Sequence, residues 1–426
     1  MKSLTRRNAL IGAGAAATYF LTGPSIRAQE KVTLRVTAAP SIVADMYRLM
    51  GEAFMAKHPD IAVAIDSTQR DYNALLDATL RDALTAQLAD VSIQGNNKLR
   101  LYVDRAMAVA LDDYLTAEAR DPSSTLSPSV SSIGRVGAKT YALGLLVSTP
   151  LIFYNLDILK SAGIDPSNLP TSWEGIVELA RKIDDPATST LGAYYTYDQQ
   201  DWFWIALIES QGGRMMNADG TDVGFAGPEG LKAMQILKAF GEAGQAKVDM
   251  PRDQVRQLFA AGKLGILVDS SGSLDTFEKQ AAGRFSIATR PFPLLSAEGR
   301  LPAGGALGIV FAQDPARQKA AWEFLKFAAS AEGQMIIAKN SGYMVANSLV
   351  ATTPDMLGDY FAGKPNMKPV VDQLGILDGW FAFPGSNGGE ITKALIDHMR
   401  TVITLQVEPK AGLDAMVADV RKLLAK

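Results

Sequence analysis

One stretch of the sequence, 141–173, restricts what the rest of the chain can form. It opens with the apolar run 142–147, breaks at 148–150 (STP) and resumes as 151–154 (LIFY). Because proline has no backbone N–H to give to a neighbouring strand, Pro150 inside an apolar, β-rich run is typical of an edge or a crossover and not of a central strand. The stretch therefore predicts a point where the chain leaves one lobe and enters another.

Short apolar runs alternate with helical patterns in the part of the chain before this stretch. Runs that predict strands lie at 32–36, 61–65 and 89–93, and apolar residues at helical spacing occupy 42–57 and 72–88. Strands that alternate with helices predict a parallel sheet covered by helices on both faces. In such sheets ligands bind beyond the carboxyl ends of the strands, so the candidate contacts are the loops 37–41, 69–72 and 94–97.

Two features after the crossing are compatible with a ligand site. An apolar run at 264–268 ends in the polar loop 269–273 (DSSGS). This loop either contacts a ligand or caps the next helix, because Ser and Asp are favoured at helix N-caps. The segment 194–204 gathers aromatic rings, which either pack in a core or offer a stacking face to the C–H groups of a sugar.

The first 28 residues have the features of an export signal. Lys2, Arg6 and Arg7 precede the apolar segment 10–21, and a cleavage site is expected near Ala28. The order TRRNAL at 5–10 is similar to a twin-arginine signal. The alternative, a transmembrane anchor, is not favoured because the apolar segment is shorter than the ~20 residues that span a bilayer. We therefore expect a mature protein in a Gram-negative periplasm.

Composition excludes several classes of site and partner. The chain has no cysteine, which excludes disulfides, thiolate metal sites and a lipid-modified cysteine anchor. Its histidines, His58 and His398, lie in no metal or nucleophile motif, so no catalytic residue, metal or cofactor is expected. The signal segment carries four basic residues and no acidic one, so its removal lowers the net charge from −3 to −7. An acidic chain argues against a nucleic-acid partner.

An ordered set of short segments carries a family resemblance over nearly the whole chain after residue 28. The segments are 141–143 (YAL), 153–157 (FYNLD), 162–164 (AGI), 170–174 (PTSWE), 259–265 (FAAGKLG), 321–327 (AWEFLKF) and 341–343 (SGY). With these segments in this order, the chain resembles the extracellular solute-binding proteins of ABC importers, in their large carbohydrate-binding family.

The resemblance implies an α/β fold of the periplasmic binding protein type II class. In that fold two discontinuous lobes are joined by a hinge and the ligand cleft lies between them. Lobe 1 is expected to comprise 29–145 and 307–345, and lobe 2 to comprise 146–306 and 346–426. The implied function is to capture a carbohydrate-like solute by lobe closure and deliver it to a membrane permease with its cytoplasmic ATPase. Such a receptor is expected to be a monomer and not an enzyme.

Within that family the sequence resembles the glycerol-3-phosphate-binding branch, through 148–150 (STP), 270–274 (SSGSL), 304–306 (GGA) and 341–343 (SGY). By that resemblance six residues fall on ligand-contacting positions, namely Tyr72, Ser148, Trp202, Ser270, Gly305 and Tyr343. The strand ends and the aligned late helix add five further candidates, namely Thr37, Gln94, Asn96, Asp269 and Thr392.

Two departures from this branch bear on the ligand. The branch carries a carboxylate near the third strand exit, where this chain has Gly95, and a phosphate-binding arginine where it has Thr392. Without that arginine a phosphate loses a bidentate, charge-assisted contact. We therefore favour a sugar, polyol or glycoside that is neutral or weakly charged. A receptor for glycerol-3-phosphate or its diesters remains the alternative.

A periplasmic enzyme that acts on glycosides is the alternative from another class. Glycosidases use two carboxylates, and Asp269 and Glu390 are conceivable members of such a pair. The family resemblance implies binding alone, so this alternative is not favoured. Hydrolysis of glycosides that is lost in an Asp269→Asn variant would establish it.

Overall fold

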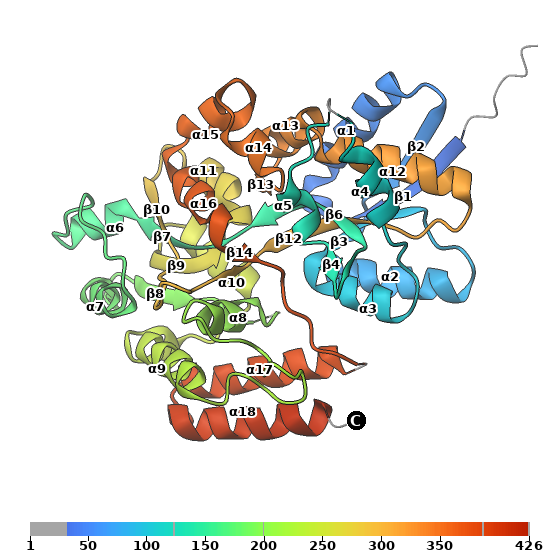
Figure 1. Ribbon diagram of the computed structural model, residues 1–426. Helices are drawn as coiled ribbons and strands as arrows, with labels where there is room; N and C mark the ends of the chain where they lie inside the picture. Colours follow the sequence, from blue (N-terminus) through green and yellow to red (C-terminus); the bar gives the residue numbers. More distant parts are fainter. Residues whose placement is uncertain (1–31, 122–123, 199, 386, 425–426) are drawn as a thin grey trace, which may run out of the picture.

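Two main β-sheets with helices around them, and two small two-stranded sheets, make up the described part of the fold (Figure 1). The computed structural model describes residues 32–121, 124–198, 200–385 and 387–424. The expected signal segment, 1–28, and its cleavage site lie outside the described residues. Among the described residues no helix is both long and apolar enough to pass through a membrane.

The first sheet has six strands in the order β13-β6-β12-β3-β1-β2. The strands are β1 (Val32–Ala38), β2 (Ile61–Asp66), β3 (Val91–Gly95), β6 (Ala142–Ser148), β12 (Gly304–Val310) and β13 (Met344–Val345). The predicted strands form β1, β2 and β3, which pair in parallel, whereas β12 is antiparallel to both β3 and β6. The carboxyl ends of β1, β2, β3 and β6 therefore lie at one edge of this sheet.

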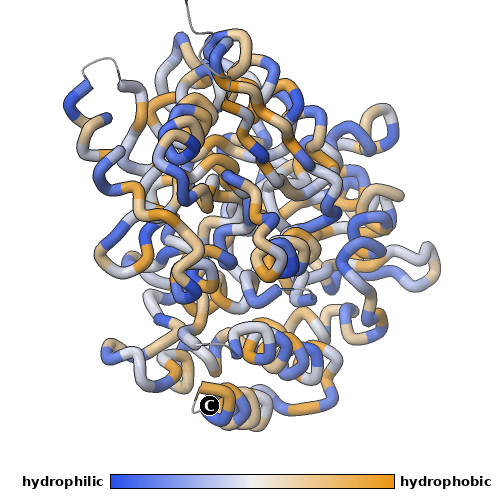
Figure 2. The backbone as a smooth tube through the Cα atoms, turned by 90° about the vertical axis from the view of Figure 1, so that its right-hand side faces the viewer, coloured by the Kyte–Doolittle hydropathy of each residue, from blue (hydrophilic) through white to orange (hydrophobic). Residues whose placement is uncertain are grey.

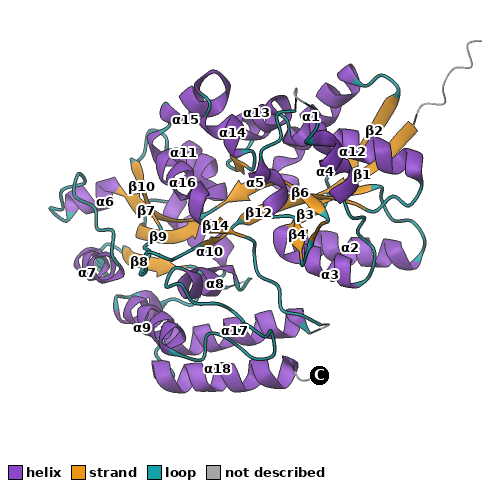
Figure 3. Cartoon of the chain, viewed as in Figure 1, coloured by secondary structure: helices purple, strands orange, loops and turns teal. Residues whose placement is uncertain are grey.

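Helices cover both faces of the first sheet (Figures 1 and 3). One side carries α1 (Ala44–Lys57), α12 (Pro315–Ala329) and α13 (Ala331–Asn340), and the other carries α2 (Tyr72–Leu84) and α3 (Leu99–Asp104). Leu34, Val36 and Ile93 are buried in the sheet. This arrangement is the covered parallel sheet that the alternation of strands and helices predicts.

The second sheet has four strands in the order β10-β7-β9-β8. They are β7 (Pro150–Asn155), β8 (Leu191–Tyr195), β9 (Leu264–Ser270) and β10 (Ile287–Pro291). Strands β8 and β9 are parallel, so residues that follow both of them meet at one edge. Around the sheet lie α7 (Trp173–Ile183), α8 (Trp202–Glu209), α9 (Pro228–Glu242), α10 (Arg252–Ala260) and α11 (Leu274–Ala281).

The C-terminal part of the chain returns to the second sheet. Helices α17 (Gly388–Ile403) and α18 (Pro409–Leu424) pack against each other and against α9. Hydrophobic and hydrophilic residues alternate along these helices (Figure 2), as expected for helices that bury one face. Ile391, Leu395 and Met399 form the buried stripe of α17.

The chain passes between the sheets at the predicted stretch. Strand β6 ends at Ser148 in the first sheet, and β7 begins at Pro150 in the second, with Thr149 between them. Pro150 is thus the first residue of an inner strand, a position that proline tolerates. The expected lobe limits at 145/146 and 306/307 fall inside β6 and β12. The division into lobes stays a proposal, for which strand pairing favours Thr149 and Ala303 as crossing points.

Candidate functional site

Segments of both sheets meet at their carboxyl edges, a region called the junction below. From the first sheet come the ends of β3 and β6 and the loop that carries Tyr343. From the second come the ends of β8 and β9 and the start of α8. Direct contacts join the two sides. Trp202 Nε1 donates to Pro302 O at 2.9 Å, just before the chain enters β12, and a Cβ added at Gly304 in β12 would lie 2.9 Å from the Trp202 ring. A Cβ added at Gly272 would lie 3.3 Å from the Tyr343 ring.

Tyr72 reaches the junction because it is the first residue of α2. Asp71 caps this helix, and its carboxylate accepts the backbone N–H groups of Asn73 and Ala74. A Cβ at Gly95 would lie 2.8 Å from the Tyr72 ring, so the ring occupies the space that a side chain at position 95 would need. The Tyr72 hydroxyl is buried without a hydrogen-bond partner among the described residues. Burial raises the pKa of Tyr72, and the nearby Tyr343 adds to this, so the hydroxyl keeps its proton.

Asn96 links β3 to the loop before β12. Its Nδ2 donates to Ala303 O at 3.0 Å and to Gly304 O at 3.3 Å. The Oδ1 atoms of Asn96 and of Asn97 are buried and have no partner in the described part of the chain. Burial lowers the pKa of the adjacent Lys98, while the charge of Asp201 opposes this change. The exit of β3 therefore brings two unpaired amide oxygens and one ammonium group to the junction.

Trp202 and Ser148 are brought together. A Cβ at Gly304 would lie 2.5 Å from Ser148 Oγ and 2.9 Å from the Trp202 ring, so the two side chains border one small space. The indole is nearly buried and its ring centre is 5.8 Å from that of Trp380. Gly305 has a backbone role, because its φ of +109° favours glycine and a Cβ there would meet Leu146 O at 2.1 Å.

Thr392 is held close to Trp202 because it forms a hydrogen bond with Asp201, the residue before Trp202. Thr392 Oγ1 donates to Asp201 Oδ2 at 2.9 Å, and Trp380 Nε1 donates to Oδ1 at 3.1 Å. Burial raises the pKa of Asp201, and these hydrogen bonds oppose the shift. The hydroxyl at the position aligned with the branch's arginine is thus engaged within the junction.

Asp269 and Ser270 end β9 with their polar groups already engaged. The Asp269 carboxylate is fully buried and forms ion pairs with Arg252 and Arg256. Burial alone would raise the pKa of Asp269, but the two guanidinium charges outweigh it and hold the pKa well below its usual range. Ser270 Oγ accepts the N–H of Gly272 at 3.2 Å, which is the helix-cap role considered for this loop. A carboxylate in this state is not poised as a catalytic acid.

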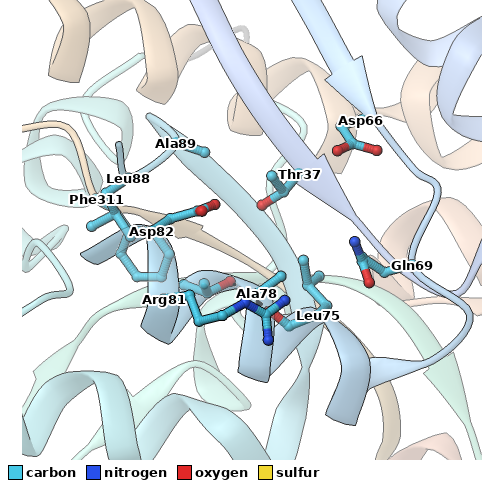
Figure 4. A pocket seen from close by; sticks show the side chains of 11 residues that line it. Thr37, Asp66, Gln69, Leu75, Ala78, Arg81, Asp82, Leu88, Ala89 and Phe311 are labelled. Atoms are coloured by element: carbon cyan, nitrogen blue, oxygen red, sulfur yellow. Dashed lines mark hydrogen bonds between the residues drawn. The ribbon is translucent and has the colours of Figure 1, made fainter. Parts of the chain in front are cut away.

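Thr37 and Gln94 lie apart from this group because they are still within strands, where side chains point to the faces of the sheet. Gln94 is buried, with Nε2 donating to the Tyr102 hydroxyl at 3.1 Å. Thr37 Oγ1 donates to Ser92 Oγ at 3.1 Å. Thr37 also borders a cavity of about 250 Å³ between α2 and the sheet, with Asp66, Gln69 and Asp82 around it (Figure 4). This cavity was not predicted from the sequence.

Sequence reasoning missed four polar residues at the junction, namely Lys98, Asp201, Arg252 and Arg256, whereas Asn97 lies in the expected contact loop 94–97. Lys98 directly follows that loop, and Asp201 directly precedes Trp202, so their neighbours could have indicated them. The arginines had no such signal, because their contact with Asp269 depends on how α10 docks.

A comparison with known families decides the class of protein. Residues 39–335 match the family described as bacterial extracellular solute-binding protein, and this range is more than half of the chain. The chain belongs to this family. The α/β architecture and the export of a solute-binding protein agree with the resemblance recognised in the sequence.

Relatives and solved structures agree with that family. A putative binding protein of Brucella abortus is 25% identical to this solute-binding protein over 387 residues, covering 88% of this chain and 89% of its own. The sn-glycerol-3-phosphate-binding periplasmic protein UgpB of Agrobacterium fabrum is 26% identical over 234 residues, 54% of this chain and 53% of that protein.

Two crystal structures show the same fold as this solute-binding protein. UgpB from Mycobacterium tuberculosis in complex with glycerophosphocholine matches with a TM-score of 0.78 at 19% identity, covering 92% of this chain and 98% of that one. The cyclic alpha-maltosyl-1,6-maltose binding protein from Arthrobacter globiformis matches with a TM-score of 0.75 at 20% identity, covering 92% and 99%. The fold is therefore that of the type II periplasmic binding proteins.

Proposed function

We propose that this protein is the substrate-binding component of an ABC importer and captures a carbohydrate-like solute at the junction. One observation carries the proposal. Buried polar atoms without partners among the described residues come from both sides, with Tyr72 Oη, Asn96 Oδ1 and Asn97 Oδ1 on the first sheet. The second sheet contributes Asp198 Oδ1, three residues beyond the end of β8.

Unpaired buried polar atoms are costly, at about 1–3 kcal/mol each, and native proteins leave few of them. A solute rich in hydroxyl groups can donate to the amide and carboxylate oxygens and accept from the tyrosine. The rings of Trp202 and Trp380 supply an apolar face beside these groups, and such a mixed lining is typical of small-molecule sites. A ligand that touches both sides stabilises the closed arrangement of the lobes, which presents the receptor to its permease and ATPase.

The cyclic alpha-maltosyl-1,6-maltose named for the Arthrobacter globiformis protein supports a sugar or glycoside, and a polyol offers the same kind of hydroxyl groups. Glycerol-3-phosphate and its diesters form the alternative. The UgpB relatives favour this alternative, whereas Thr392 argues against it because it stands where the branch has a phosphate-binding arginine. The protein is proposed to act as a monomer in the periplasm, without a lipid anchor or a nucleic-acid partner, after cleavage near Ala28. It is proposed to bind its solute without chemical turnover.

A thermal-shift screen of the mature protein against sugars, polyols and glycerophosphodiesters tests this function. A ligand at about 100 times its Kd adds about 2.7 kcal/mol of stability, which is readily detected. We expect a shift with at least one sugar or polyol. A shift with glycerol-3-phosphate alone would establish the alternative, and the absence of any shift would contradict the function.

A further inference from the structure

The proposed function leaves two arginines of the junction without a role. Arg252 and Arg256 lie one turn apart on α10, and both direct their guanidinium groups at Asp269 at the carboxyl end of β9. Arg252 Nε is 3.0 Å from Asp269 Oδ1, and Arg256 Nε is 2.7 Å from Oδ2. Arg252 also lies over the Phe203 ring at 5.5 Å, next to Trp202. Burial would lower the pKa of Arg256, but Asp269 and, from across the junction, Tyr343 raise it.

The arginines carry more hydrogen-bond donors than Asp269 can accept. A guanidinium group has five N–H donors and no acceptor. Asp269 Oδ1 already accepts from both arginines and from the backbone N–H of Ser270 at 2.6 Å. Within the described part of the chain, neither arginine uses its Nη1 group in a hydrogen bond or ion pair. The Arg256 side chain is 32% exposed and the Arg252 side chain 12%, so Arg256 is the more accessible.

The positive charges of these two arginines exceed the negative charge that lies within ion-pair distance of them. Asp269 is the one carboxylate within ion-pair distance of either guanidinium among the described residues. Asp198 contacts α10 through the backbone, where its Oδ2 accepts the N–H of Arg252 at 2.8 Å, and burial raises its pKa. Asp253, on the same helix, adds a charge near Arg256. Two guanidinium groups therefore share one ionised carboxylate in a partly buried place.

We propose that Arg256 binds an anionic group of the solute, a carboxylate or a phosphate ester carried by a sugar or polyol. Arg252 and Asp269 are positioning residues that hold Arg256, and Tyr72 adds an unpaired hydroxyl donor from the first-sheet side of the junction. The proposal rests on the proposed function, because it concerns the ligand of the same site. The threonine at position 392 thus does not make the junction neutral, since α10 supplies a cationic contact from another direction.

Calorimetric titration with matched ligands tests this assignment. Suitable sets are glucose, glucuronate and glucose 6-phosphate, and glycerol, glycerate and glycerol 3-phosphate, each measured with the mature protein at low and high salt. We expect an anionic member to bind about tenfold or more tightly than its neutral counterpart, and to lose part of this advantage at high salt. The preferred anion within a set distinguishes a carboxylate from a phosphate solute.

Variants locate the effect. Arg256→Gln removes one charge while Arg252 still pairs with Asp269, and it should weaken binding of the anionic member by about tenfold or more while sparing the neutral one. Arg421→Gln is the control. Arg421 lies on α18, away from the junction, and forms an exposed ion pair with Asp222.

Three outcomes distinguish a failure of the assignment of Arg256 from a failure of the proposed solute-binding function. Equal affinities for neutral and anionic members, or anion binding that neither salt nor Arg256→Gln changes, overturn the inference and leave the function standing. The salt dependence is measured on the unsubstituted protein, so this readout does not require that the variant folds. A protein that binds no compound in either panel contradicts the proposed function itself.

Discussion

Gly95 shows how one small residue shapes the junction. The resemblance leads one to expect a carboxylate near this strand exit, but here the Tyr72 ring occupies the space. The hydroxyl of that tyrosine then stays buried and unpaired. The absence of a carboxylate at position 95 and the position of the Tyr72 ring therefore belong to the same packing arrangement, because the ring fills the space that a side chain at 95 would need.

Gly95→Ala tests this packing at the scale of a residue. The added methyl group meets the Tyr72 ring, and overpacking of this kind costs about 1–3 kcal/mol. We expect lower stability in urea denaturation and at least tenfold weaker binding of the ligand found in the thermal-shift screen. Gly375→Ala is the matched control, since nothing lies within 4 Å of a Cβ there. Unchanged affinity in Gly95→Ala would remove Tyr72 from the site.

Glu209 gives a second test at this scale, through pH. It lies at the end of α8, and burial, with a smaller effect of Asp378, raises its pKa to about 8. The unfolded carboxyl ionises near pH ~4.3, so between the two values the folded state binds more protons and stability falls as pH rises. We expect Glu209→Gln to weaken this pH dependence, so that the variant gains stability relative to the unsubstituted protein from pH 5 to pH 8. Parallel pH profiles in urea denaturation would show that Glu209 ionises normally.

At the scale of elements, the sequence predicted the strands well and the side-chain directions less well. Alternating patterns located β1, β2 and β3, and the proline located the passage from β6 to β7. The resemblance located Ser148 and Trp202, which the structure brings together. Thr37 and Gln94 were expected at loops, yet both strands extend past these residues, so their side chains face neighbouring helices. The pairing of α10 with Asp269 depends on tertiary docking, which local patterns do not encode.

The cap of α2 is an element whose local role and site role can be separated. Asp71→Ala removes the side-chain acceptor at the N-cap and should cost about 1 kcal/mol. Because Tyr72 is the next residue, we also expect weaker ligand binding. Ser172→Ala removes the cap of α7, where Ser172 Oγ accepts from Gly175 N, and should cost similar stability without changing affinity. Equal affinities in the two variants would contradict a role of the α2 start in binding.

At the scale of the whole molecule, two discontinuous sheets meet through a few short segments. The chain passes through Thr149, and the loop before β12 is held by Asn96 and Trp202 from opposite sides. Four buried polar atoms that lack partners among the described residues lie at this meeting place, on Tyr72, Asn96, Asn97 and Asp198, while others, such as those of Asp112 and Trp173, lie elsewhere in the fold. The four come from both sheets, which is what a receptor needs if its ligand is to complete the contact between the two sheets.

Amide hydrogen exchange of the mature protein, with and without the solute found by the screen, tests capture between the sheets most directly. We predict that the solute slows exchange on both sides at once, in 95–99 and 303–306 from the first sheet and in 200–204 and 270–274 from the second. The helices α17 and α18 should remain unchanged beyond their first turn and serve as the internal control. Protection confined to one sheet, or to the cavity beneath α2, would contradict binding at the junction.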